Sequence, residues 1–170
     1  MGLSESLLPE FDNEMVGTRK TLERVPDDKA DWKPHEKSSA MGGLATHLAN
    51  IPTWANYTID DDSLDLAPGG KPLPPMAMAK SNAELLATFD ANVAKARAAI
   101  AGASDAELFK PWSLMTNGNT ILTLPKIAVR SMPPSKKEAG SWLALIVPPK
   151  TLSHGFPIDT PLVVAHSRSP

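Results

Sequence analysis

Proline decides where this chain can form long helices. Seven of its seventeen prolines fall in the last 41 of 170 residues, at positions 133, 134, 148, 149, 157, 161 and 170. A proline inside a helix removes a hydrogen-bond donor and collides with the preceding turn. The two Pro-Pro pairs therefore exclude a long helix across residues 132–170, and the helical part of the chain has to lie before them.

Three segments before this region have the period of an amphipathic helix. Their apolar residues recur three and four positions apart, which places them on one helix face. These segments cover about residues 7–25, 41–55 and 81–102. Pro52 lies inside the second pattern, so we expect a kink or an early end there. Ser81 and Glu84 match a capping box, which predicts that the third helix begins at this point, and Gly102 is a natural terminator.

The segments between and after these helices are less regular. Residues 60–80 combine acidic residues, prolines and glycines without a period, and we interpret them as a surface connection. Asn117-Gly118 is typical of a turn, and the apolar residues 121–129 predict the start of a fourth helix. We therefore expect an all-α fold. It consists of an incomplete up-and-down helical bundle over residues 1–131 and an irregular or disordered tail over residues 132–170.

Composition excludes several classes of function. Seventeen Lys and Arg against nineteen Asp and Glu give a net charge of −2, so the chain lacks the basic surface that nucleic-acid binding requires. The absence of Cys excludes disulfides, a thiolate nucleophile and any zinc site built on sulfur. There is no basic-then-apolar leader and no apolar run of the roughly 20 residues that span a bilayer. We expect a cytoplasmic protein without membrane contact.

A metal site in this chain would need His, Asp or Glu ligands. His47 lies on the apolar stripe of the second helix, so we expect its ring to point into the bundle or along the boundary between helices. Such a histidine is either a hydrogen-bonded core residue or a metal ligand. His35 falls in a loop, His154 and His166 lie twelve residues apart in the proline-rich tail, and no His-x-x-x-His pair exists. The acidic run 60–62 is an alternative source of ligands.

Several local strings, taken in order, resemble the DinB-like family of helical bundles related to bacterial thiol-dependent transferases. They are LERVPDD at 22–28, DWKPHEKS at 31–38, LATHLA at 44–49 followed by Trp54, and Pro111-Trp112 ahead of LPKIAV at 124–129. The resemblance covers about residues 7–131. It implies a four-helix bundle that binds a divalent metal, zinc or nickel, through three histidines. His47 matches the ligand on the second helix.

The sequence departs from the family pattern where the other two ligands belong. The family places a His-x-x-x-His pair on the last helix, and this chain has Met132-Pro-Pro-Ser-Lys-Lys there, an abrupt change that also fits a shifted reading frame. A site with one histidine left binds metal far more weakly. The resemblance thus implies a metal-dependent transferase or hydrolase for small molecules or thiols, impaired in this chain. The alternative is a non-catalytic helical structural or interaction domain, which an uncovered apolar face could make a homodimer.

Overall fold

The structure is a computed structural model that describes residues 2–74 and 76–129, and this part is mostly helical. The long helices are α1 (Leu3–Leu22), α2 (Met41–Asn50), α3 (Thr53–Asp60) and α4 (Asn82–Gly102). The shorter elements are η1 (Asp27–Lys29), η2 (Pro68–Gly70), α5 (Asp105–Leu108), α6 (Lys126–Val129), β1 (Ser63–Asp65), β2 (Pro111–Thr116) and β3 (Asn119–Pro125). The predicted tail, 132–170, lies outside the described residues.

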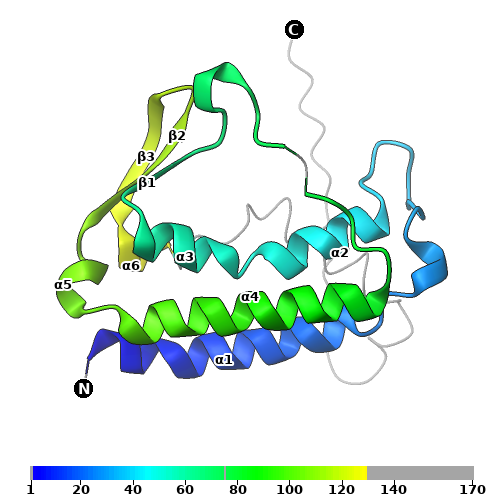
Figure 1. Cartoon of the computed structure of the whole chain (residues 1–170), viewed down its shortest axis with the longest axis horizontal. Helices are drawn as coiled ribbons and strands as arrows, with labels where there is room; N and C mark the ends of the chain where they lie inside the picture. The colour runs from blue at the N-terminus through cyan, green and yellow to red at the C-terminus, as the bar shows by residue number, and fades with distance from the viewer. Residues whose placement is uncertain (1, 75, 130–170) are drawn as a thin grey trace, which may run out of the picture.

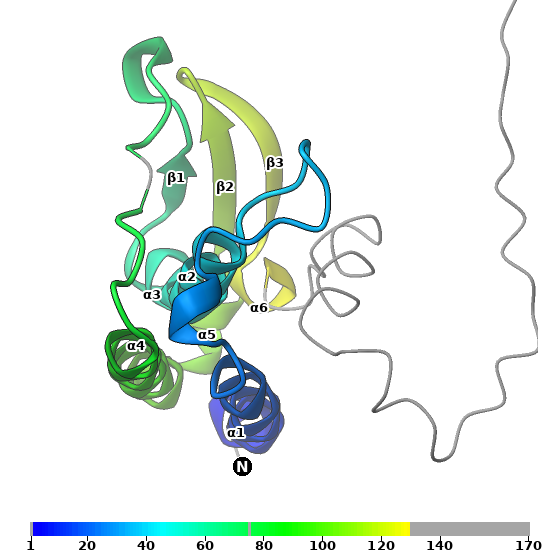
Figure 2. The same ribbon diagram turned by 90° about the vertical axis from the view of Figure 1, so that its right-hand side faces the viewer.

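Three long helical units run alongside one another. They are α1, α4 and the consecutive pair α2–α3, and Figure 1 shows their axes aligned. The view along these axes places them at three corners of a triangle, with a small sheet rising above α3 (Figure 2). Within residues 2–74 and 76–129, no helix has both the length and the apolar character needed to cross a membrane.

Local sequence signals account for where these helices begin and end. Ser81 is the N-cap of α4: its hydroxyl accepts a hydrogen bond from the Glu84 amide at 3.2 Å, and the Glu84 carboxylate accepts one from the Lys80 amide at 2.9 Å. The predicted start of the third helix is therefore confirmed. Pro52 separates α2 from α3, and the Thr53 hydroxyl donates to the Asn50 carbonyl at 2.6 Å across the break. The predicted interruption at Pro52 is confirmed as well.

The predicted all-α class is confirmed only in part, because the described chain is mostly helical but contains a three-stranded sheet in the order β1-β2-β3. The strand β2 pairs antiparallel with β3 and parallel with β1. Residues 121–125, which we expected to begin a fourth helix, belong to β3, and only residues 126–129 are helical. The physical reason is the turn before them: Asn117 and Gly118 adopt φ values of 49° and 75°, which fold the chain into a tight hairpin.

Asp65 of β1 binds the turn of the β2–β3 hairpin through hydrogen bonds. Its carboxylate accepts hydrogen bonds from the amides of Asn117 at 3.0 Å, Gly118 at 2.8 Å and Ala67 at 2.9 Å. These bonds favour the charged form and so lower the pKa of Asp65 below its ordinary value, with the Ala67 and Gly118 amides as the main causes. The segment 60–80 that we interpreted as a surface connection thus contributes a strand and a carboxylate that holds the turn.

The core consists of two clusters of buried apolar side chains, one toward each end of α4. One contains Leu22, Val25, Ala45, Ala49, Leu85 and Phe89. The other contains Leu7, Ile100, Ala103 and Leu108. The helix α4 contributes to both, because its apolar stripe packs against α1 and against α2–α3. The sheet is joined to this core by Trp112, whose side chain is 1% exposed.

Candidate metal site on the second helix

His47 lies near the end of α2, on the side that faces away from α4. Ala45 and Ala49, two positions before and after it, are buried in one cluster with Phe89 of α4. Residues two apart on a helix differ by about 200° in direction, so His47 points to the opposite side, where it is exposed. Of the two expected orientations, the one into the bundle is therefore wrong, because the small alanines face α4, whereas the one along the boundary between helices stays a prediction.

The surroundings of His47 do not supply the ligand set that the family resemblance implies. Its neighbours one turn away, Gly43 and Ile51, carry no metal-binding atoms in their side chains. In the part of the chain that the structure describes, no three side chains of His, Cys, Asp or Glu are grouped so that they could hold a metal ion. The described residues thus do not fit a three-histidine centre, and the assignment of His47 as a ligand stays a prediction.

The other candidates from the sequence lie apart from one another. His35 is exposed in the loop before α2, where its Nδ1 accepts a hydrogen bond from the Lys37 amide at 3.2 Å. The acidic run 60–62 ends in Asp62, whose carboxylate lies 3.5 Å from the ammonium of Lys126. This carboxylate therefore has a structural partner in the fold. His154 and His166 lie outside the described residues.

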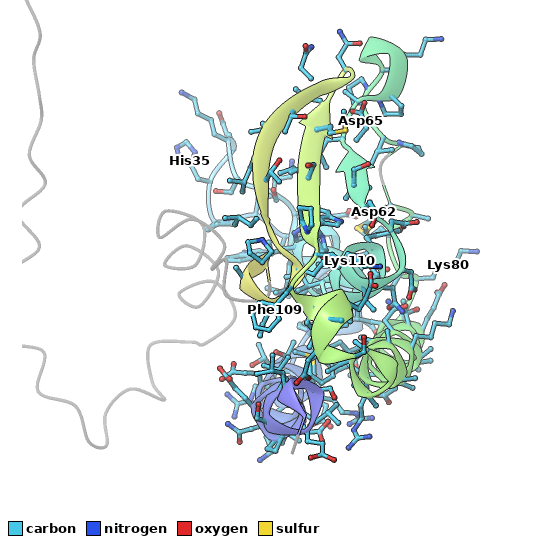
Figure 3. The ribbon with its side chains drawn as sticks, turned by 90° about the vertical axis from the view of Figure 1, so that its left-hand side faces the viewer. His35, Asp62, Asp65, Lys80, Phe109 and Lys110 are labelled. Carbon is cyan, nitrogen blue, oxygen red and sulfur yellow. The ribbon has the colours of Figure 1, made fainter. Side chains whose placement is uncertain are left out.

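The sequence analysis missed a charged cluster at the end of α3. Lys126 is 1% exposed, and its ammonium donates to the Ile59 carbonyl at 3.0 Å and to the Glu107 carboxylate at 2.5 Å. The second oxygen of Glu107 lies 2.6 Å from the ammonium of Lys110. Figure 3 labels Lys110 and Asp62 at this end of the molecule. Hydrogen bonds from Lys110 and then Lys126 lower the pKa of Glu107, and Glu107 in turn raises the pKa of Lys110.

Two buried side chains donate hydrogen bonds to carbonyls at the C-terminal end of α3. The last carbonyls of a helix have no amide partner within it. In α3 the carbonyl of Tyr57 accepts a hydrogen bond from the indole of Trp112 at 3.0 Å, and that of Ile59 accepts one from Lys126. The positive charge of Lys126 also suits the negative end of the helix dipole. Trp112 and Lys126 belong to two of the strings that carry the family resemblance, and both bind carbonyls near the end of α3 here.

A small pocket lies at the other end of the bundle. It is lined by residues from the end of α1 and the starts of α2 and α4, among them Val25, Gly42, Ala45, Ser81 and Leu85. Its volume is about 20 Å³, which is room for one water molecule. A substrate of several non-hydrogen atoms does not fit there.

Comparison with known proteins identifies one family. The model of the DinB superfamily matches residues 11–146, which is most of the chain and includes His47, Trp112 and Lys126. Neither the curated proteins nor the solved structures include a match to this sequence. The matched range begins within α1 and continues past the end of α6. The chain therefore belongs to the DinB superfamily.

Proposed function

We propose that this chain is a DinB-superfamily domain in which metal-dependent transferase or hydrolase chemistry is impaired, and that it acts as a helical structural or interaction domain. The observation that carries the proposal is the donor set around His47. The described residues place no group of three metal-binding side chains, and the whole sequence contains no His-x-x-x-His pair.

The energetics of metal binding support this proposal. A catalytic zinc site uses typically three protein ligands and keeps a further position for water or substrate. One imidazole on an exposed helix face provides a single ligand, and most of the binding free energy depends on a complete, preformed set. A chain of this kind therefore binds zinc or nickel too weakly to retain it at cellular concentrations.

The second candidate is the metal-dependent transferase or hydrolase itself, acting on a small molecule or a thiol. The superfamily match favours it, since the match continues to residue 146 and so crosses the position of the last helix. In that case His47 needs two further ligands from residues 130–170, where His154 and His166 are the only histidines.

Metal analysis of the purified, tag-free full chain separates the two candidates. Zinc and nickel per chain are measured in the wild type, in His47→Ala and in His35→Ala, which removes an exposed loop histidine as the matched control. We expect much less than one metal per chain, equal in all three proteins. About one metal per chain in the wild type and in His35→Ala, lost in His47→Ala, would establish the metalloenzyme candidate and overturn the proposal.

A further inference from the structure

The tip of the β2–β3 hairpin carries a side chain that can react with its own backbone. Among the asparagines of the sequence, only Asn117 is followed by glycine. Both residues of this pair are exposed, and both have positive φ, 49° at Asn117 and 75° at Gly118. Glycine has no Cβ that would shield its amide nitrogen from the preceding side chain. The turn therefore combines the two groups that deamidation of an asparagine requires.

The reaction is a cyclisation followed by hydrolysis. The Gly118 nitrogen attacks Cγ of Asn117, and the new N–Cγ bond replaces the Cγ–Nδ2 bond. Nδ2 leaves as ammonia together with the proton of the Gly118 amide, and a five-membered succinimide ring remains. Water opens this ring at either carbonyl and gives aspartate or its β-linked isomer, isoaspartate, with no oxidation or reduction. Either product changes the net charge of the chain from −2 to −2 − 1 = −3.

Hydrogen bonds around the turn oppose the ring closure. The Gly118 amide donates to one carboxylate oxygen of Asp65 at 2.8 Å, and the Asn117 amide donates to the other at 3.0 Å. The carbonyl of Asn117 accepts a hydrogen bond from the Asn119 side chain at 3.2 Å. Ring closure requires rotation about the Cα–C bond of Asn117 and removal of the Gly118 proton. These bonds hold the peptide group between Asn117 and Gly118 in place and so resist both.

The charge of Asp65 adds to this restraint. Figure 3 labels Asp65 close to the tip of the hairpin. The attacking group is the deprotonated amide of Gly118, and a second negative charge within hydrogen-bond distance of a carboxylate is unfavourable. The backbone amides lower the pKa of Asp65, so the carboxylate is charged at neutral pH.

We propose that Asn117 is a deamidation site and that Asp65 controls its rate, so that the reaction proceeds when the tip of the hairpin separates from Asp65. The hydrogen bonds of the turn are exposed, and local opening of such a segment costs less free energy than unfolding of the whole domain. The proposal does not depend on whether the chain binds a metal.

The products alter the contact that holds the turn. A Cβ placed on Gly70 would lie 3.4 Å from the side-chain oxygen of Asn117, so this side chain lies against η2. Deamidation puts a second carboxylate into the turn that binds the carboxylate of Asp65, and like charges repel. The β-linked product also adds a carbon to the backbone of a turn that needs positive φ at both central residues. The modification therefore weakens the connection between the hairpin and β1.

Peptide mapping by mass spectrometry after incubation of the full chain at mildly alkaline pH tests the proposal. The deamidated fraction of Asn117 is followed with time in the wild type, in Asp65→Asn and in Asp61→Asn, each in buffer and in urea. Asp61→Asn is the matched control, because it removes the same charge from an exposed residue four positions earlier. Asn119, which precedes the β-branched Thr120, is the internal reference. Circular dichroism verifies that each variant is folded in buffer.

In buffer, we expect Asn117 to react slowly in the wild type and in Asp61→Asn, and at least about ten-fold faster in Asp65→Asn, the factor that loss of one hydrogen bond to a charged group gives. In urea, all three chains should react at one faster rate, with Asn117 ahead of Asn119. Equal rates in buffer for the wild type and Asp65→Asn would overturn the proposal. An equally fast wild type in buffer and in urea would also overturn it, and this comparison holds even where Asp65→Asn does not fold.

Discussion

Trp112 connects the sheet to the helices, and its replacement by Phe tests whether this connection stabilises the fold. The indole is 1% exposed and donates to the carbonyl of Tyr57 at 3.0 Å. Phe retains most of the apolar contact, including that with the ring of Trp54, whose centroid lies 6.5 Å away. The variant loses the hydrogen bond and leaves the Tyr57 carbonyl without its indole donor. Such a loss costs about 1–3 kcal/mol of unfolding free energy.

Denaturant unfolding followed by far-ultraviolet circular dichroism measures this cost without depending on tryptophan fluorescence. Trp32→Phe is the matched control, because Trp32 is 44% exposed in the loop before α2. An exposed substitution of this kind changes the unfolding free energy by less than about 0.5 kcal/mol. If Trp112→Phe and Trp32→Phe unfold at the same midpoint with the same slope, the indole hydrogen bond does not stabilise the end of α3.

Two further predictions concern charged groups. Lys126→Met removes the donor to the Ile59 carbonyl and should lower the unfolding free energy by about 1–3 kcal/mol. Lys110→Met is the control, because the Lys110 side chain is 57% exposed, and it should leave the unfolding free energy nearly unchanged. Equal effects of the two substitutions would show that the buried lysine does not stabilise the fold. The folded state lowers the pKa of Asp65, so this carboxylate stabilises the protein above its ordinary value of 3.8 and loses that contribution as the pH falls through the folded-state pKa. Asp65→Asn should therefore lose less unfolding free energy than the wild type between pH 6 and pH 3, and parallel losses would refute the assignment.

The helices could be predicted because their signals are local. Ser81 and Glu84 satisfy backbone donors within one turn, and Pro52 breaks a helix wherever it stands in one. The sheet depends on partners far apart in the chain. Residues 63–65 have no strand pattern of their own and form β1 only through pairing with residues 113–115. Such a pairing has no signature in a single sequence.

The β2–β3 hairpin, in contrast, could have been predicted from the sequence. Asn117-Gly118 between apolar segments is a strong short-range hairpin pattern. Leu122 and Leu124 are half-buried while Thr123 between them is exposed, which is the period of a strand. The apolar content of residues 121–129 favours a helix instead, and that prediction is wrong for residues 121–125. The burial of Lys126 was not predicted for the same reason. A lysine at the start of an expected long helix gives no reason to expect a buried side chain.

The orientation of His47 illustrates a limit of helical periodicity. The stripe through Leu44, Leu48 and Ile51 and the stripe through Ala45 and Ala49 both satisfy a helical repeat, and larger side chains made the first the natural choice for the core. The structure packs Ala45 and Ala49 against α4, since small residues let two helices approach closely. Leu44 is buried and Leu48 packs against the same cluster, so the predicted stripe is confirmed at these positions, whereas His47 and Ile51 are exposed. The metal analysis decides what this exposed histidine does: little metal, equal in the wild type and in His47→Ala, supports a domain that kept its architecture and lost its ligands, whereas stoichiometric metal that depends on His47 requires residues 130–170 to bring the other donors to it.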